Sequence, residues 1–456
     1  MQLQLVSLNF CELCRSLSSL HLIVGTGVHA LVCADSTATD IKAKKLRGTR
    51  VPTLQPLILT WKLSSFCLNR FSSKVLANIK KLIFGEHFNA EIDEIRRLSS
   101  LQELTFGQDF DQAIDSVSWP TTVQQLTFGC RFNQPINHFA WPASLKHLTF
   151  GVDFNQTINN VAWPTSLQQL KFGYDFNHAI SDVAWPASLQ QLTFGYDFNQ
   201  AISDVTWPAS FQKLTFGFRF NQAINVVAWP ACFQQLTFGY RFNQAISDVA
   251  WSASLQKLTF GDSFNQAINN VAWPKLLQQL TFGYYFNQAI NDVAWPASLQ
   301  QLTFGVCFNQ AIHDVAWSES LQQLTFGECF NQAINGAVLP ASLQELAFGF
   351  IFNRWPPYLQ KLTFGHHFNQ AINDVVWPAF LQQLTFGQCF NQAMNGVALP
   401  ASLRQLTFGY HFNQAINDVL WPAFLQQLTF GQCFDQAIDE VSWPESLQEL
   451  TFITLT

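Results

Sequence analysis

One pattern recurs along the chain every 22 residues, and this period limits the possible folds more than any other feature. The Leu of a Leu-Thr-Phe-like triplet marks each copy, and 18 such residues run from Leu82 to Leu450. Every step is 22 residues long except the step from Leu346 to Leu362, which is 16. A copy of this length has too little core to fold alone, so neighbouring copies must stack. The period therefore predicts a solenoid.

The apolar residues of one copy predict a short strand followed by a longer loop. In LTFGYDFNQAISDVTWPASFQK (192–213), Leu192 and Phe194 alternate with Thr193, as in a half-buried strand. Phe198, Ile202 and Val205 are spaced by four and three residues, which fits either one helical turn or an irregular stretch. The expected core positions of this copy are Leu192, Phe194, Phe198, Ile202, Val205, Trp207 and Phe211.

Three other recurring residues have separate expected roles. A Gly follows the triplet in 17 of the 18 copies, which indicates either a bend with positive φ or a backbone too close to the next coil for a Cβ. In most copies a Pro follows the Trp, and because Pro lacks a backbone N–H it suits a corner of the coil. An Asn follows the second Phe in nearly all copies, and its amide is expected to bond loop backbone in adjacent coils. Asp111 and Asp435 replace it and are expected to be less well satisfied, because Asp accepts but does not donate.

The 16-residue step predicts a local irregularity. It keeps Phe352-Asn353 and Trp355-Pro356 but lacks six residues, including the Ile and Val positions. We expect the strand side to continue unbroken, the opposite side to narrow, and the stack to kink.

The repeat also resembles a known family. The run Phe132-Asn133-Gln134-Pro135-Ile136, in a framework of FGxxFNQxI and WPxSLxxL, looks like the FNIP repeat, which is similar to leucine-rich repeats and occurs in many F-box proteins. The resemblance covers about 82–456, although most copies have Ala in place of the Pro. It implies an open, right-handed, β-rich solenoid: a leucine-rich-repeat-like stack of 22-residue coils with one short parallel strand per coil. The implied role is protein interaction, often within a ubiquitin-ligase adaptor.

The expected domain organisation follows the repeat and the charge. Residues 1–80 have a net charge of +7 (10 basic, 3 acidic), and the remainder has −13 (14 basic, 27 acidic). We expect a basic, non-repeat, partly disordered region at 1–55 and the repeat solenoid at 82–456. Because Leu59-Thr60-Trp61 imitates the triplet, residues 56–81 are expected to form a degenerate capping coil. Residues 1–55 show no clear Leu-Pro opening of an F-box.

Composition and motifs weigh against several function classes. The net charge of −6 gives no reason to expect nucleic acid as a partner. No apolar run reaches the roughly 18 residues of a membrane helix, so no membrane partner is expected. The ten Cys follow no small disulfide framework, which favours a cytoplasmic location. The sequence contains no GxxxxGK[ST], GxSxG or HExxH motif, so we expect neither an enzyme nor a cofactor.

The two positions between the Gly and the second Phe vary most and form the candidate binding site. In a solenoid they make two columns whose members lie about 4.8 Å apart. Exposed Tyr beside Arg and Asp is typical of a binding surface, although the rings could instead only cover the Phe core. The candidate binding residues are Tyr174, Asp175, Tyr196, Asp197, Phe218, Arg219, Tyr240 and Arg241.

Metal sites in the second column are disfavoured. Asp153, Asp175 and Asp197 could hold calcium, but the flanking Arg131 and Arg219 are the favoured partners of these acids. A later part of the column has zinc-ligand types but spans about 14 Å, whereas zinc holds its ligands within about 2.3 Å. These residues are His367, Cys389, His411 and Cys433.

A pair of thiols in the same column could form a disulfide. Cys307 and Cys329 occupy neighbouring coils and could reach the required distance, although two free thiols are favoured.

The favoured function is a protein-interaction scaffold that binds an extended or multivalent protein partner. The segment FGYDFN occurs at both 172–177 and 194–199, and such identical neighbouring coils suit a repeated contact better than a unique pocket. One alternative is the substrate-recognition adaptor of an SCF-type ubiquitin ligase, which would bind a Skp1-like protein. Another is a structural or surface-binding solenoid, for glycan or ice. Such a solenoid is expected to have a flat face with two columns of Thr, and the sequence has one.

Overall fold

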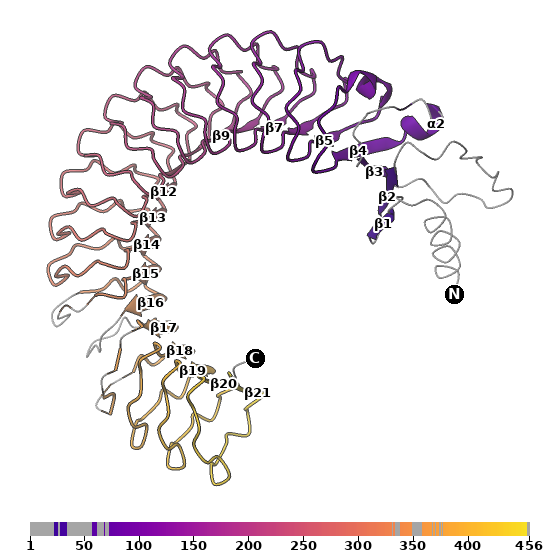
Figure 1. The fold of residues 1–456 in the computed structure, drawn as a ribbon. Coiled ribbons are helices and arrows are strands. Elements are labelled where there is room, and N and C mark those ends of the chain that lie inside the picture. Colours follow the sequence, from indigo (N-terminus) through magenta and orange to yellow (C-terminus); the bar gives the residue numbers. More distant parts are fainter. Residues whose placement is uncertain are drawn as a thin grey trace, which may run out of the picture. The chain divides into compact units, whose positions relative to one another are not determined.

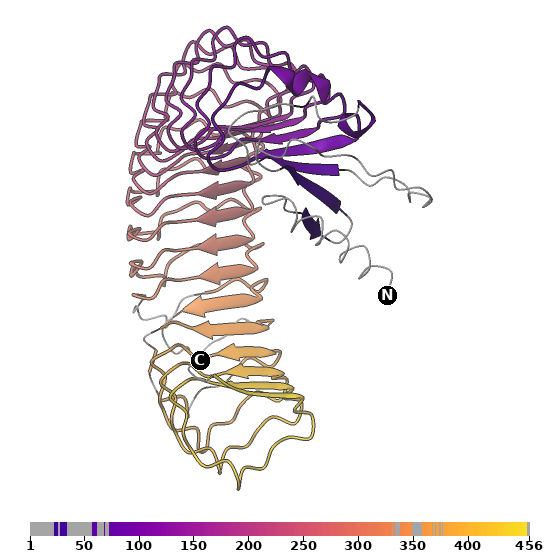
Figure 2. The ribbon, with the colours of Figure 1, turned by 45° about the vertical axis from the view of Figure 1, so that its right-hand side comes forward.

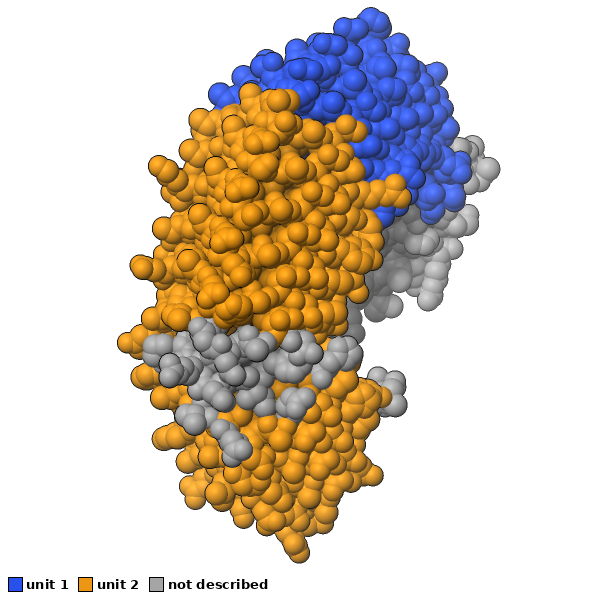
Figure 3. Space-filling model, turned by 90° about the vertical axis from the view of Figure 1, so that its left-hand side faces the viewer, with its two compact units in different colours: residues 1–220 blue, residues 221–456 orange. Residues whose placement is uncertain are grey.

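The computed structural model describes most of the chain as two compact units. Its described residues are 22–25, 28–33, 57–61, 68, 73–330, 332, 338–348, 358–366, 368–369, 371–373, 375 and 377–453. The first unit comprises residues 1–220 and the second residues 221–456, and Figure 3 shows them in different colours. Each unit is described by itself.

The first unit opens with paired strands and continues as a stack of coils. Its elements are β1 (Leu22–Gly25), β2 (Val28–Cys33), β3 (Leu57–Trp61), α2 (Ser73–Leu76), β4 (Ile79–Phe84), the 3-10 helix η1 (Asp93–Arg97), β5 (Glu103–Thr105), β6 (Gln125–Thr127), β7 (His147–Thr149), β8 (Gln169–Lys171), β9 (Gln191–Thr193) and β10 (Lys213–Thr215). Strands β1 and β2 pair antiparallel, whereas β2–β3 and all later pairs of this unit are parallel.

The described residues of the second unit form coils of the same kind (Figure 1). Its strands are β11 (Gln235–Thr237), β12 (Lys257–Thr259), β13 (Gln279–Thr281), β14 (Gln301–Thr303), β15 (Gln323–Thr325), β16 (Glu345–Phe348), β17 (Lys361–Phe364), β18 (Gln383–Thr385), β19 (Gln405–Thr407), β20 (Gln427–Phe430) and β21 (Glu449–Phe452). They pair in parallel, and Figure 2 shows the strands β12 to β16 lying side by side.

The strands pair in register at the triplet, as the 22-residue period predicts. In the first unit Leu192 lies opposite Leu214, and in the second Leu258 lies opposite Leu280. The expected solenoid with one short parallel strand per coil is confirmed.

The triplet-like Leu59 also lies opposite Leu82, which stacks β3 on the first regular copy. The proposed boundaries at 1–55 and 56–81 stay a prediction, because most of 1–55 lies outside the described residues.

The core is made of the apolar residues that the period selects. All seven core positions expected in 192–213 are buried, with exposed fractions between 0% and 7%. Phe194 stacks on Phe198 of its own coil, with ring centroids 3.7 Å apart, and on Phe216 of the next coil at 5.8 Å. The stretch from Phe198 to Val205 contains turns and no helix, so the irregular alternative is the correct one. Aromatic stacking thus continues from coil to coil and substitutes for a single globular core.

The recurring Gly is needed because adjacent backbones lie very close together, which decides between the two sequence alternatives. A Cβ on Gly261 would lie 1.8 Å from the carbonyl oxygen of Gly239, far inside any real contact. Among the described residues, Gly396 is the one glycine with positive φ (+77°), and it does not follow a triplet. The backbone approach therefore explains the glycine in almost every copy.

The Asn residues form the expected ladder between coils. In the second unit, Asn243 Oδ1 accepts a hydrogen bond from the backbone N–H of Asn265 at 2.9 Å and another from Gln266 Nε2 at 3.0 Å. The expectation for Asp111 was wrong. Asp111 Oδ1 accepts the same two bonds, from Asn133 N–H at 2.9 Å and Gln134 Nε2 at 2.9 Å. The ladder uses this side chain as an acceptor, and a carboxylate fills that role as well as an amide does.

At the 16-residue step the strand side continues as expected. Strand β16 pairs with β17 in register, with Leu346 opposite Leu362. The narrowing and the kink fall on residues 349–357, which lie outside the described residues.

Replacement of the Gly should destabilise the stack strongly. We expect Gly261→Ala to cost about 1–3 kcal/mol or more of unfolding free energy, because its Cβ overlaps backbone that cannot move alone. Gly396→Ala is the control: nothing lies within 4 Å of its added Cβ, so only the backbone strain of φ +77° remains. Chemical denaturation of both variants gives the comparison. Equal losses would contradict the close-approach explanation.

The Asn ladder predicts opposite outcomes for two substitutions at one position. We expect Asn243→Leu to cost about 1–3 kcal/mol, because it leaves the Asn265 N–H without its acceptor. Asn243→Asp should be far milder, since Asp111 already holds this role in another coil. Thermal melting of both variants measures the difference, and a leucine variant as stable as the parent would show that the amide is merely solvated.

Candidate functional site

The candidate binding residues lie on the turns that follow the strands, and backbone hydrogen bonds hold these turns in register. The N–H of Asp197 donates to the carbonyl of Tyr174 at 2.9 Å, and the N–H of Arg219 donates to that of Tyr196 at 2.9 Å. Each turn therefore presents its two variable side chains directly beside those of the next coil. We call this side of the stack the turn edge; it comprises the two residues between the Gly and the second Phe of each coil.

Three aromatic rings form a continuous stack on the turn edge of the first unit. Tyr174 and Tyr196 have ring centroids 4.3 Å apart and an interplanar angle of 6°. Tyr196 and Phe218 follow at 4.4 Å and 5°. The Tyr174 side chain is 45% exposed, while the buried Phe198 lies in the core stack on Phe194 and Phe220. These rings thus make a second aromatic column outside the core.

Arg219 contacts both an aromatic and an acidic residue of the turn edge. Its guanidinium carbon lies 5.7 Å from the centre of the Tyr196 ring, within range of a cation–π contact. Its Nε lies 3.2 Å from Asp197 Oδ1, which confirms the expected pairing. That oxygen is buried and takes no hydrogen bond within the described structure, so the contact is an ion pair of imperfect geometry.

The expected pairing of Arg131 with the acidic trio was wrong. Arg131 contacts Asp109 on the other side, with its Nε 3.4 Å from Asp109 Oδ1. Among the described residues, the structure gives basic partners to Asp109 and Asp197 but to neither Asp153 nor Asp175. Burial raises the pKa of Asp175, and the negative charges of Asp153 and Asp197 raise it further. The column therefore carries like-charge repulsion.

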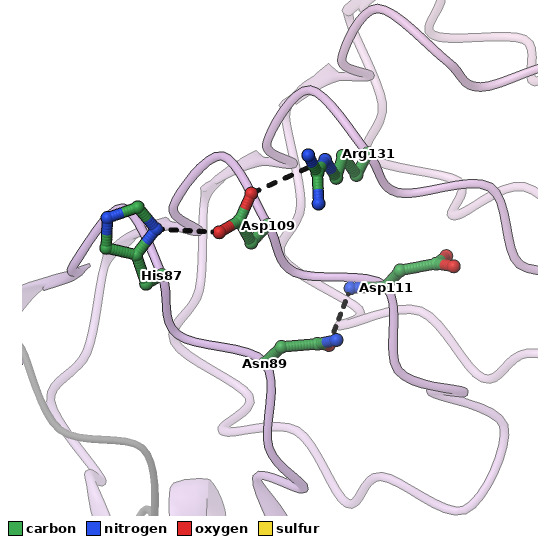
Figure 4. Close-up of polar contacts among 5 residues, drawn as sticks. All are labelled: His87, Asn89, Asp109, Asp111 and Arg131. Carbon is green, nitrogen blue, oxygen red and sulfur yellow. Dashed lines mark hydrogen bonds and ion pairs between the residues drawn. The ribbon is translucent and has the colours of Figure 1, made fainter.

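A second polar cluster was missed by the sequence reasoning. Figure 4 shows Asp109 between His87 and Arg131, with His87 Nδ1 2.7 Å from Asp109 Oδ2. The hydrogen bond to Asp109 and the charge of that carboxylate raise the pKa of His87. All three residues occupy the second variable position of successive coils, so the column pattern was the signal that could have found them.

Figure 4 also shows the ladder contact between Asn89 and Asp111 beside that cluster, where the Asp111 N–H donates to Asn89 Oδ1 at 2.9 Å. The ladder thus runs next to the turn edge and holds its backbone.

Tyr240 and Arg241 belong to the second unit and have different neighbours. A hydrogen bond to Tyr285 is the main cause that raises the pKa of Tyr240, with a smaller contribution from the charge of Asp262. Tyr284 and Tyr285 are 43% and 46% exposed and pack edge to face at 4.8 Å. These two exposed rings were absent from the predicted binding set. Tyr284 was visible in the first column, whereas Tyr285 departs from the polar residues of the second.

Cys307 and Cys329 are both free thiols, as favoured. Burial raises the pKa of the Cys307 thiol, and its contact with Cys329 raises it further. Within the described part of the chain, no three His, Cys, Asp or Glu side chains converge to hold a metal. His367 of the disfavoured zinc set lies outside the described residues.

The strand face, which consists of the side chains of the strands that do not enter the core, is polar, unlike the aromatic turn edge. Gln191 and Thr193 lie on either side of the buried Leu192 and are both half-buried. Among the described residues, no helix has the length and apolar character needed to cross a membrane.

Comparison with known proteins gives two kinds of match. A family model described as FNIP Repeat matches residues 132–175, 176–219, 264–307, 308–351 and 390–420. The structure of CroV588, a circular leucine-rich-repeat protein, is 34% identical to this chain with a TM-score of 0.50. That match covers 87% of this chain and 75% of the other.

A chain of the Drosophila Toll–Spätzle complex shares the fold alone, at 10% identity and a TM-score of 0.57 over 91% of this chain and 66% of its own length. No curated protein sequence matches the chain. The motif matches and the CroV588 identity agree with the repeat geometry, and the chain accordingly belongs to the FNIP repeat family.

Proposed function

We propose that this protein is a protein-binding scaffold and that the turn edge of its first unit contacts an extended partner. The observation that carries the proposal is the stack of Tyr174, Tyr196 and Phe218, which lies outside the core. The core is complete without these rings, because the inward Phe columns already continue through the same coils. Aromatic side chains and Arg are the residues that most often dominate protein interfaces.

The acidic residues Asp153, Asp175 and Asp197 support a binding role, because their like charges lower the stability of the fold. Asp153 and Asp175 occupy the same position of neighbouring coils without a basic partner in the described structure. Burial raises the pKa of Asp175, and the negative charges of Asp153 and Asp197 raise it further. Perturbed ionisable groups tend to gather at functional sites, since a fold gains nothing from them. A partner that brings Lys or Arg to these carboxylates would relieve the repulsion.

The repetition of the edge defines the shape of this partner. Tyr174-Asp175 and Tyr196-Asp197 are the same pair presented twice, one coil apart. An extended segment with several basic side chains can contact both pairs at once, and linked contacts raise apparent affinity by about 10²–10⁴. Tyr240 and Arg241 occupy the equivalent two positions on a turn of the second unit, where we assign them to the contact with the partner as well.

The binding role can be tested by removing the three rings. In the full chain, Tyr174→Ala/Tyr196→Ala/Phe218→Ala should abolish binding to a partner captured and identified with the parent protein, and each single change should weaken it by about 1–2 kcal/mol. Affinity is measured by calorimetry at two salt concentrations. Binding of the parent should weaken at high salt, because exposed ion pairs are screened.

A matched control changes the strand face of the same coils. Gln191→Ala/Thr193→Ala/Thr215→Ala alters three half-buried polar side chains and leaves the turn edge intact. It should bind like the parent, and both variants should melt close to the parent temperature. If the ring variant binds normally while the strand-face variant does not, the binding face is the strand side.

The cost of the acidic column gives a pH-dependent prediction. Because the folded pKa of Asp175 is raised, its deprotonation destabilises the fold, so the cost is present above the folded pKa and vanishes below the unfolded pKa near 3.8. Asp175→Asn should therefore raise the melting temperature slightly at pH 7 and have no such effect near pH 3. Melting curves of the two proteins across this range check it; a stabilisation independent of pH would contradict the repulsion.

A further inference from the structure

The turn edge of the first unit contacts arginine side chains of its own chain, and these contacts show which ligand chemistry fits it. Arg219 reaches back to the preceding coil, where its Nε lies 3.2 Å from Asp197 Oδ1. Its guanidinium carbon lies 5.7 Å from the centre of the Tyr196 ring. One guanidinium thus contacts the Tyr and the Asp of the same turn.

A second arginine makes the same ionic contact in an earlier coil. Arg131 places its Nε 3.4 Å from Asp109 Oδ1 of the preceding coil, as Figure 4 shows. In both examples the arginine approaches the carboxylate through Nε, an atom that lysine lacks. The turn at Asp109 carries Gln108 in place of a Tyr, so this copy has the ion pair without the ring.

Between these two examples, the turn at Tyr174 and Asp175 repeats the Tyr-Asp pair that Arg219 contacts, but no arginine follows it. The residue one coil further on is Arg219 in the first case, whereas it is Asp197 in the case of Asp175. Among the described residues, neither Asp175 nor Asp153 has a basic partner, because the two arginines pair with other carboxylates. The same local chemistry therefore occurs once with a guanidinium from the chain and once without it.

This turn is open to a ligand from outside. Tyr174 is 45% exposed, and Asp153 and Asp175 are half-buried. The two carboxylates occupy the same position of adjacent coils, which the hydrogen bond from the Asp175 N–H to the Val152 carbonyl holds in register at 3.0 Å. Two carboxylates beside an exposed ring fit a planar cation with several N–H donors, and a guanidinium has five. Its charge would also offset the repulsion between the carboxylates.

We propose that Tyr174, Asp153 and Asp175 form a binding site for one arginine side chain of the protein partner. The inference rests on the proposed function, because it names the chemistry of the partner at the same turn edge. The guanidinium lies against the Tyr174 ring and pairs with the carboxylates, in the way that Arg219 contacts the next Tyr-Asp pair. A lysine ammonium is a point charge without the planar fork that spans two carboxylates, so the site selects arginine over lysine.

The test measures the binding of short fluorescein-labelled peptides to the full chain by fluorescence anisotropy at one fixed salt concentration. The peptides share a Gly-Ser sequence with several evenly spaced test residues, which are arginine, lysine or the uncharged citrulline. The arginine peptide should bind about threefold to tenfold more tightly than the lysine peptide, because the guanidinium adds the ring contact and the second carboxylate. The citrulline peptide should not bind measurably, since it lacks the charge.

Variants of the two carboxylates locate the site. Asp153→Asn/Asp175→Asn should weaken binding of the arginine peptide by about tenfold, because it removes the charged acceptors. The matched control is Asp439→Asn/Glu440→Gln, which removes the same number of charges from an exposed turn of the second unit and should bind like the parent. Both variants should melt at or above the parent temperature. Tyr174→Leu should reduce the preference for arginine over lysine and leave binding of the lysine peptide nearly unchanged.

Three results would overturn the proposal. They are equal affinity for the arginine and lysine peptides, no binding of the arginine peptide, and an equal loss of binding in the carboxylate variant and its control, which would reflect net charge alone. The proposed function has a separate readout, the captured partner, which the variant without the three rings should lose. Failure of the arginine site and failure of the binding role therefore stay distinguishable.

Discussion

The close approach of successive backbones at the recurring glycine is the constraint on which the rest of the structure depends. A Cβ added at these glycines would lie between 1.5 and 2.0 Å from a carbonyl oxygen of the preceding coil. Only glycine permits this spacing, and the spacing in turn allows the strands to pair in parallel and the Phe rings to stack. The Asn ladder then satisfies the loop backbone at the same interval. Core packing, hydrogen bonding and register are thus consequences of one contact.

The same register also determines which surface side chains of adjacent coils become neighbours. Because the core needs only the triplet, the second Phe and the later Ile, Val and Trp positions, the two residues between the Gly and the second Phe can vary. Each variable residue is nevertheless placed beside its counterpart in the next coil, as the bonds from Asp197 to Tyr174 and from Cys389 to His366 show. A change in one turn therefore creates a new neighbour pair. This allows one scaffold to present aromatic and charged residues in one unit and contacts between thiol and imidazole side chains in the other.

Several features of the site could not be predicted from the sequence, and the reason is the direction of side chains. The columns placed Arg131 next to both Asp109 and Asp153, but spacing alone did not say which carboxylate its side chain contacts. Asp111 was expected to satisfy the ladder poorly, because a residue type does not reveal whether a position uses its donor or its acceptor. The contacts between thiol and imidazole side chains were hidden for a similar reason: one histidine comes from the first variable position and the other from the second.

By itself, the sequence determined the period, the short parallel strand, the identity of the core residues and the need for glycine in almost every copy. It could do so because each of these follows from a pattern repeated many times, and the stacking of identical units leaves few alternatives. Tertiary structure alone decided that glycine serves close approach rather than positive φ, that the loop is irregular, and which variable side chains meet. These outcomes depend on distances of a few ångströms between neighbouring coils, where backbone spacing and side-chain rotamers act together, and no periodicity in the sequence encodes them.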